Sequence, residues 1–168
     1  MDIISELKAV SGAANVLTGR DAAPLAEDWT GRYRSAPRAA VRPGSTAEVS
    51  AILRLATRTG TPVVPVSGNT GLSGGTGGAD GAILLSLSRM TRIREINPRA
   101  RIAVAEAGVV IETLQRRAEE EALVFPLSFG ARGSAMLGGA LSTNAGGANV
   151  LRYGNARDLC LGLEAVLP

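Results

Sequence analysis

Apolar residues recur at helical spacing in the first third of the 168-residue chain. From Val49 to Ala56 they fall on one stripe of a 3.6-residue period, which predicts an amphipathic helix that ends before Gly60. Ser45 and Glu48 stand three residues apart at its start, which is the spacing of a capping box. The pattern therefore predicts a helix with a defined beginning and end.

Short apolar runs on both sides of this helix predict strands over residues 39–42, 62–66 and 82–87. The last run is almost continuously apolar, as expected for a strand that is buried on both faces. A strand, a helix and a strand joined by short connections form a βαβ unit, which favours a parallel sheet.

The remaining elements follow from shorter or looser patterns. We expect a short helix at 2–10, an irregular lead-in at 18–38, a strand at 101–106, an amphipathic helix at 110–122, a short strand at 123–125 and a final strand at 161–167.

Glycine is concentrated in two windows, residues 68–81 and 130–154, each of which holds seven of the 21 glycines. Such clustering marks places where the backbone bends or approaches something closely, not a flexible linker. The first window is compatible with an anion site made of backbone N–H groups or with a long hairpin loop. The second is compatible with a flat surface for a planar ligand or with tight backbone packing.

Composition excludes several chemistries. The chain has no histidine, a single lysine (Lys8) and a single cysteine (Cys160), so it has no His-based triad, Walker A lysine, internal disulfide or Cys₄ zinc site. A Gly-x-Ser-x-Gly match around Ser73 therefore has no histidine partner within the chain. We expect no metal site.

The charge distribution argues against a nucleic-acid partner. The net charge is +3, aromatic residues make up 3% of the chain, and arginines are scattered among acids. No apolar stretch approaches the length of about 20 residues that spans a bilayer, and the start of the chain lacks the pattern of a secretory signal. We therefore expect a cytoplasmic protein.

Several motifs occur together in a fixed order. They are Pro-x-x-Gly-Asn-Thr-Gly-Leu-x-Gly-Gly at 65–75, Gly-Ala-Arg-Gly-Ser at 130–134, Gly138-Gly139, Thr-Asn-Ala-Gly-Gly at 143–147, Arg-Tyr-Gly at 152–154 and Val-Arg-Pro-Gly-Ser-Thr-Ala-Glu-Val at 41–49. In these motifs the chain resembles the FAD-binding domain of the vanillyl-alcohol oxidase type of flavoprotein. It is most similar to the FAD-linked D-2-hydroxyacid dehydrogenases, which include D-lactate dehydrogenase, the FAD subunit of glycolate oxidase and D-2-hydroxyglutarate dehydrogenase.

The resemblance implies an α+β fold of two small α/β-type subdomains with FAD between them, incomplete at its C-terminal end. We expect an N-terminal helix and lead-in over 1–38 and the FAD-binding domain over 39–168, with subdomains at about 39–97 and 98–168. Asp28-Trp29-Thr30-Gly31-Arg32-Tyr33 is a phrase common before this domain, and we expect Trp29 and Tyr33 to pack the lead-in.

The resemblance also implies the cofactor site, with the loop at 67–75 around the pyrophosphate and the segments at 126–134 and 138–147 along the flavin. The implied FAD-binding residues are Val66, Ser67, Gly68, Asn69, Thr70, Gly71, Leu72, Pro126, Gly130, Gly133, Ser134, Gly138, Gly139, Thr143, Asn144 and Gly146. Asn69 stands near the place where some relatives attach FAD through a histidine, so non-covalent FAD is expected.

By the same resemblance, the function is transfer of hydride from a D-2-hydroxyacid substrate to flavin N5, with a separate electron acceptor. Catalytic residues are expected beyond residue 168. Two alternatives remain: a truncated, non-catalytic FAD- or nucleotide-binding module, and a flavoenzyme of the same fold that acts on another substrate.

Overall fold

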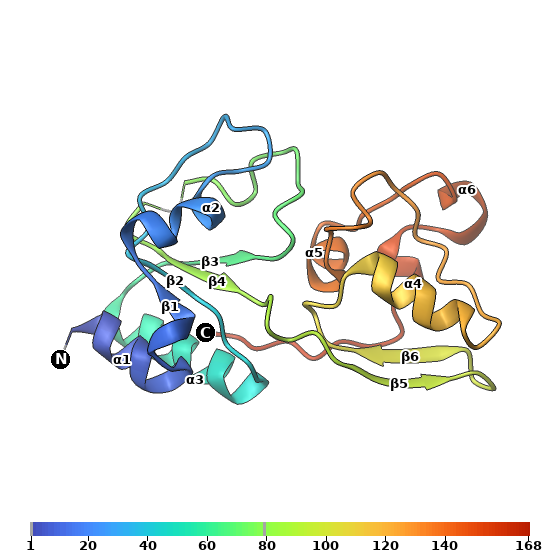
Figure 1. The fold of residues 1–168 in the computed structure, drawn as a ribbon, viewed down its shortest axis with the longest axis horizontal. Coiled ribbons are helices and arrows are strands. Elements are labelled where there is room, and N and C mark those ends of the chain that lie inside the picture. Colours follow the sequence, from blue (N-terminus) through green and yellow to red (C-terminus); the bar gives the residue numbers. More distant parts are fainter. Residues whose placement is uncertain (1, 79) are drawn as a thin grey trace. The chain divides into compact units, whose positions relative to one another are not determined.

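The computed structural model describes residues 2–78 and 80–168, which form two compact units. Unit one comprises the residues up to Arg89 together with Ala165–Pro168, and unit two comprises Met90–Glu164. Each unit combines helices with a small sheet, so the predicted α+β class is confirmed (Figure 1).

Unit one is built on a four-stranded sheet with the strand order β1-β2-β4-β3. Its strands are β1 (Val16–Leu17), β2 (Ala39–Val41), β3 (Val63–Val66) and β4 (Ile83–Ser86). Both β2 and β3 run parallel to β4, whereas β1 is antiparallel to β2. The predicted βαβ unit is therefore present, with β4 between its two strands.

Helices cover both faces of this sheet. In the described part of unit one they are α1 (Ile3–Ser11), η1 (Ala13–Asn15), η2 (Gly19–Asp21), α2 (Ala23–Ala26) and α3 (Thr46–Thr59). Figure 1 shows α1 and α3 on one side of the sheet and α2 on the other. Leu84 packs in a buried cluster with Ala26 of α2, and strand side chains alternate between faces, so Ile83 points to the opposite side.

Helix α3 begins much as its sequence predicts. The Ser45 Oγ accepts a hydrogen bond of 3.2 Å from the Glu48 N–H, which is the first arm of a capping box. The Glu48 carboxylate accepts from the Gly44 N–H at 3.0 Å, one residue before the cap. At the other end, Gly60 takes a left-handed φ of 60° and ends the helix.

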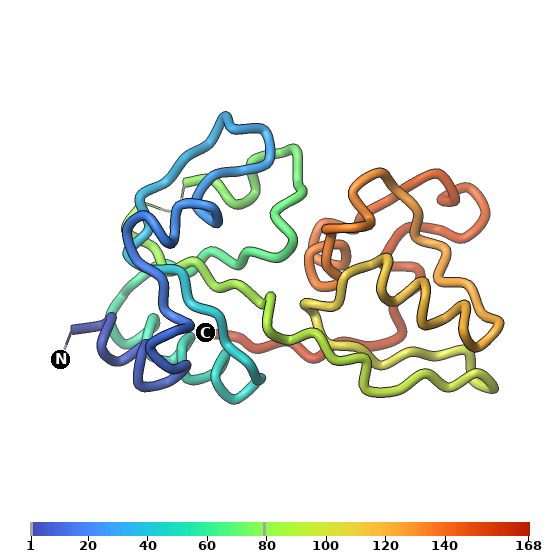
Figure 2. The backbone as a smooth tube through the Cα atoms, in the orientation of Figure 1, coloured from blue at the N-terminus to red at the C-terminus, as the bar shows by residue number. Residues whose placement is uncertain are grey.

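Unit two begins with an antiparallel hairpin and continues into helices. Its elements are β5 (Ile93–Asn97), β6 (Ile102–Ala105), α4 (Ile111–Glu119), α5 (Leu137–Ser142), α6 (Val150–Tyr153) and η3 (Ala156–Leu159). Ile111 of α4 packs with Leu127, Ala135 and Ala140 in one buried cluster. The backbone trace in Figure 2 shows that the chain from 120 to 160 is mostly loop with short helices.

A buried carboxylate ties the two ends of the hairpin together. Glu106 is 5% exposed and accepts hydrogen bonds from the backbone N–H of Arg92 at 2.9 Å and from its Nε at 3.0 Å. Arg94 forms a further ion pair at 3.4 Å. Burial by itself raises the pKa of Glu106, but the hydrogen bonds and charge of Arg92 outweigh it and hold the pKa below the usual 4.5.

Several predictions about the elements were wrong. Residues 123–125 and 161–167 form no strand, since no segment in the described ranges pairs with either of them. The helix predicted over 110–122 ends at Glu119, and Ala122 has a left-handed φ of 56°. The lead-in at 18–38 is less irregular than expected, because it holds η2 and α2.

Strand β5 was not predicted. Its register shifts between Ile93 and Glu95, which interrupts the alternation that would have revealed it. The other predicted strands and helices are present with boundaries that differ by one or two residues.

Candidate functional site

The loop that follows β3 presents unpaired backbone donors. Among the described residues, no backbone carbonyl accepts a hydrogen bond from the N–H groups of residues 68–73. Gly71, Leu72 and Ser73 are exposed, and a Cβ added to Gly71 would meet no atom within 4 Å. Successive free N–H groups on an open loop fit an anion such as a diphosphate.

Asn69 joins this loop to two other segments. Its Nδ2 donates to the Glu27 carbonyl oxygen at 2.6 Å, and its Oδ1 accepts from the Thr76 hydroxyl at 2.9 Å. Its φ is 50°, in the left-handed region that asparagine tolerates better than most residues. Both the Nδ2 and the Oδ1 atoms of Asn69, a predicted cofactor residue, are therefore hydrogen-bonded to the protein.

The ring of Tyr33 packs on the far turn of the same loop. A Cβ placed on Gly74 would lie 2.6 Å from Cε2 of the ring, and one placed on Gly77 would lie 2.9 Å from the Tyr33 Cβ. Gly74 also has a left-handed φ of 69°. These two glycines are required because the lead-in lies against the loop, whereas Gly71 is open.

Asp28 holds Tyr33 in place. Its Oδ1 accepts from the Tyr33 N–H at 3.0 Å, and its Oδ2 accepts from the Thr30 hydroxyl at 2.6 Å and the Thr30 N–H at 3.1 Å. The Thr30 hydroxyl, and then the Tyr33 N–H, lower the pKa of this carboxyl against the opposing effect of its burial. Asp28 is only 4% exposed and stays a hydrogen-bonded carboxylate at neutral pH.

Sequence reasoning missed this role of the lead-in. It assigned Trp29 and Tyr33 to packing within the lead-in itself, but Trp29 is 69% exposed and Tyr33 covers Gly74 and Gly77 instead. The sequence offered one signal for this segment, the motif at residues 28–33. In the structure this motif forms a turn in which Asp28 accepts hydrogen bonds from Thr30.

In unit two, the predicted flavin segments lie against one another. The segment at 126–128 runs beside 147–149: the Ala148 N–H donates to the Ser128 carbonyl at 2.8 Å, and the Asn149 amide donates to the Pro126 carbonyl at 3.0 Å. A Cβ on Gly147 would lie 1.9 Å from the Ser128 carbonyl oxygen. Glycine is therefore required at 147 for this backbone contact.

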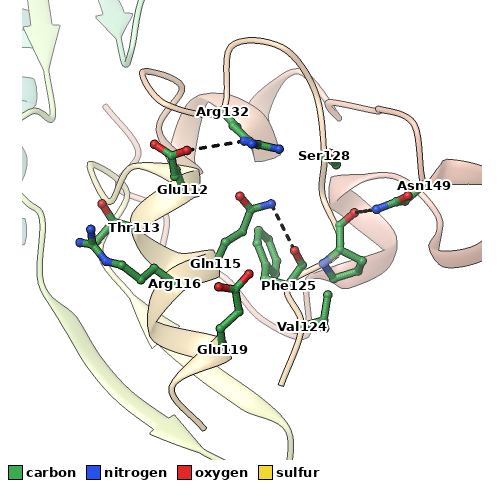
Figure 3. Close-up of a pocket in the computed structure, with 11 residues that line it drawn as sticks. Glu112, Thr113, Gln115, Arg116, Glu119, Val124, Phe125, Ser128, Arg132 and Asn149 are labelled. Carbon is green, nitrogen blue, oxygen red and sulfur yellow. Dashed lines mark hydrogen bonds and ion pairs between the residues drawn. The ribbon is translucent and has the colours of Figure 1, made fainter. Parts of the chain in front are cut away.

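A cavity of about 550 Å³ opens between α4 and the segment at 124–128 (Figure 3). Gln115 on its wall donates to the Leu127 carbonyl at 2.8 Å and the Phe125 carbonyl at 3.4 Å. Arg132 faces Glu112 at 3.6 Å across one end. Of the predicted cofactor residues, Pro126 lies in this wall, and Gly130 lies in the wall of an adjacent concavity of about 620 Å³.

The other predicted residues of unit two lie in and around α5. Gly138 is in the first turn of that helix, where its N–H donates to the Ala107 carbonyl at 2.8 Å and a Cβ would lie 2.7 Å from the Ala107 Cβ. Gly139 follows it, and the Thr143 hydroxyl donates back to the Gly139 carbonyl at 3.0 Å. Asn144 accepts from the Arg157 N–H at 3.0 Å.

Gly133 and Ser134 lie on an exposed turn, and Gly146 packs beside Asn155. Of the predicted residues of unit two, Pro126 and Gly130 line the two concavities, and the others line neither of them. Within residues 2–78 and 80–168, no three His, Cys, Asp or Glu side chains could share a metal ion, and no helix has the length and apolar character needed to cross a membrane.

The model of the FAD binding domain family matches residues 37–168 of the chain. A D-2-hydroxyglutarate dehydrogenase of Stutzerimonas stutzeri (strain A1501) is 39% identical over 165 residues, which cover 98% of this chain and 36% of that protein. The mitochondrial D-2-hydroxyglutarate dehydrogenase of Bos taurus is 36% identical over 166 residues, which cover 99% of this chain and 30% of that protein. The chain spans about a third of the length of these relatives.

Among solved structures, an alkyldihydroxyacetonephosphate synthase matches 95% of this chain and 31% of its own with a TM-score of 0.84, at 19% identity. A likeness at this identity shows the fold alone. The sequence and fold matches together confirm the resemblance on which the prediction of FAD rests.

Proposed function

The chain belongs to the FAD binding domain family, and on this premise we propose that it is the FAD-binding portion of an oxidoreductase that removes hydride from a D-2-hydroxyacid. The observation that carries the proposal is the 39% identity over 98% of the chain to a D-2-hydroxyglutarate dehydrogenase. Because the chain spans about a third of such relatives, the substrate and a separate electron acceptor are proposals for the whole enzyme.

In this proposal the loop from Val66 to Leu72 holds the pyrophosphate of FAD. The support is physical: the N–H groups of residues 68–73 have no backbone acceptor in the described part of the chain, and Gly71 leaves the loop open. Ser67 and Thr70 add hydroxyl groups beside them. No side chain with a positive charge is needed, since oriented backbone dipoles bind anions themselves.

In unit two, we assign the flavin to the region formed by Pro126, Gly130, Gly133 and Ser134 and by the residues in and after α5. This assignment is supported by two adjacent concavities, one lined by Pro126 and the other by Gly130 and Gly147. The residues of α5 and its flank in this set are Gly138, Gly139, Thr143, Asn144 and Gly146.

Bound FAD would supply the two-electron acceptor for the substrate's hydride. The chain's own task is to bind and orient that group. Non-covalent attachment is part of the proposal, because Asn69 has no nucleophilic atom and the sequence has no histidine. A cytoplasmic location stays a prediction, since one relative is named as mitochondrial.

In the experiment, D-2-hydroxyglutarate is added to the FAD-loaded protein without oxygen. Reduction is measured as the loss of the visible absorbance of oxidised flavin. The whole reading frame that contains these residues is the sample, and L-2-hydroxyglutarate is the control. We expect bleaching with the D-enantiomer only. A protein that binds FAD but is bleached by neither D-2-hydroxyglutarate nor D-lactate would contradict the substrate class while leaving the cofactor in place.

A further inference from the structure

The lead-in segment Glu27–Arg34 contacts the glycine loop at two places that lie on either side of its unpaired N–H groups. The Glu27 carbonyl accepts from Asn69 at the start of the loop, and Tyr33 packs on Gly74 and Gly77 at its end. The N–H groups of residues 70–73 lie between these two contacts in the sequence, and no backbone carbonyl among the described residues accepts from them. The lead-in therefore holds the part of the loop on which the proposed pyrophosphate contact depends.

Thr76 closes this arrangement from inside the loop. Its hydroxyl donates to the Asn69 Oδ1 at 2.9 Å, and it sits in the turn where the Gly77 N–H donates to the Gly74 carbonyl at 2.9 Å. Asn69 thus bridges the lead-in to the far turn through a single amide. We call the contacts of Glu27, Asp28, Tyr33, Asn69 and Thr76 the lead-in clamp.

We propose that the lead-in clamp pre-organises the pyrophosphate loop and that Asn69 is a positioning residue for FAD, acting through the loop backbone. This inference rests on the proposed function, since it concerns the same loop. The Asn69 amide donates to Glu27 and accepts from Thr76. Its side chain therefore fixes the shape of the loop. A loop already in its binding shape loses less conformational entropy when the anion arrives.

Asp28 is part of the lead-in clamp because it holds Tyr33, which packs on Gly74 and Gly77. Its carboxylate is 4% exposed and is used by Thr30 and Tyr33, and the Asp28 N–H donates to the Tyr33 carbonyl at 3.0 Å. The backbone of Tyr33 is therefore held from both sides. Tyr33 as a whole is 51% exposed, although its side chain contacts Gly74 and Gly77.

The decisive variant is Thr76→Val, which keeps the shape of the side chain and removes the hydroxyl that holds Asn69. Asn69→Gly is its companion, because glycine accepts the left-handed φ without strain. Affinities for FAD and for ADP are measured on the purified 168-residue chain, with FAD followed by flavin fluorescence and ADP by competition. Each single variant should weaken both affinities by roughly tenfold, the size expected when a partly buried hydrogen bond that shapes the loop is lost.

A double-mutant cycle separates positioning from direct contact. Asn69→Gly removes the bonds to both Glu27 and Thr76, whereas Thr76→Val removes only the second, so if Asn69 acts through the clamp the double variant should be no weaker than Asn69→Gly alone. Thr61→Val is the matched control, since it removes a threonine hydroxyl in unit one that bonds only to Thr59 among the described residues. The thermal midpoint without nucleotide should be the same for Thr76→Val and Thr61→Val.

A second pair of variants keeps the test independent of Asn69. Tyr33→Phe keeps the ring on Gly74 and Gly77 and should retain affinity, whereas Tyr33→Ala removes it and should lose roughly tenfold. If Thr76→Val and Tyr33→Ala both bind ADP and FAD as the wild type does, the inference is wrong. If the wild-type chain binds neither FAD nor ADP, the proposed function fails and the inference fails with it.

Discussion

At the scale of single residues, Gly147 lies against the backbone of Ser128 in unit two. A Cβ there would lie 1.9 Å from the Ser128 carbonyl oxygen, so Gly147→Ala forces the two segments apart. We expect the variant to lose about 3 kcal/mol of unfolding free energy, the upper end of the cost of overpacking. Urea denaturation followed by circular dichroism measures it.

Gly162→Ala is the control for this prediction, because a Cβ at Gly162 meets nothing within 4 Å and its φ is not left-handed. It should unfold at the same denaturant concentration as the wild type or slightly higher. Equal stability of Gly147→Ala and Gly162→Ala would mean that the contact between 128 and 147 does not exist in solution.

A second residue-scale prediction concerns Glu106, whose pKa is lowered by Arg92. A carboxyl with a lowered folded-state pKa stabilises the fold above its unfolded pKa of about 4.5, and this contribution is lost as pH falls through the folded value. Wild-type stability should therefore drop as the pH falls below about 4.5. Glu106→Gln should be less stable by about 1–2 kcal/mol at neutral pH and should show a shallower acid dependence.

The measurement is denaturant unfolding of both proteins at several pH values from neutral to acid. Glu112→Gln is the control, because it removes the same charge from an exposed position on α4. Parallel acid curves for the wild type and Glu106→Gln would argue against the buried ion pair.

Single residues also show how much of the glycine loop and its contacts can be predicted from the sequence. The glycine cluster and its small polar neighbours left the first window open between an anion site and a long hairpin loop, and only the resemblance assigned the loop at 67–75 to a pyrophosphate. Glu27 and Tyr33 were not identified as loop partners, because the hydrogen bond from Asn69 to Glu27 joins residues 42 positions apart. A contact of that separation leaves no periodic pattern in one sequence, so only the fold reveals it.

At the scale of elements, helix α3 offers a direct test of local sequence signals. Ser45→Ala removes the oxygen that accepts the Glu48 N–H and should cost about 1 kcal/mol. Ser50→Ala, in the interior of the same helix, should be neutral or slightly stabilising, because alanine is the better helix former. Thermal unfolding by circular dichroism gives both values, and equal losses in the two variants would show that Ser45 is not the cap.

The prediction of helices and strands succeeded where the apolar residues followed the pattern of burial, and it failed where they did not. Runs of apolar residues identified β2, β3 and β4; β2 and β4 are buried along their whole length, whereas β3 is buried only at Val66. Leu161 and Leu163 looked equally apolar, but they are 80% and 74% exposed and pair with no strand in the described ranges. Apolar content alone therefore does not make a strand, because a strand needs a ladder partner.

At the scale of the molecule, the two units contribute different parts of one proposed function. Unit one supplies the loop with free N–H groups, and unit two supplies the region around 126–147. Both segments were assigned to the cofactor from spaced motifs through the resemblance, and the family match over 37–168 confirms the resemblance itself. The hydroxyacid itself is specified by neither unit, so it follows from relatives that are about three times longer.

We propose that the loop around Gly71 binds the pyrophosphate of FAD. Gly71 is exposed, and a side chain there meets no atom within 4 Å, so a substitution tests binding with little cost to folding. Gly71→Asp and Gly71→Asn add side chains of nearly the same shape that differ by one negative charge. Asp should be repelled by the diphosphate, whereas Asn should not.

The measurement is titration of FAD into the wild type, Gly71→Asn and Gly71→Asp, followed by flavin fluorescence at low ionic strength. We predict saturable binding to the wild type, and an affinity for Gly71→Asp that is at least about tenfold weaker than for Gly71→Asn, since a nearby like charge costs more than about 1 kcal/mol. Equal affinities for the two variants, or no binding to the wild type, would contradict the account.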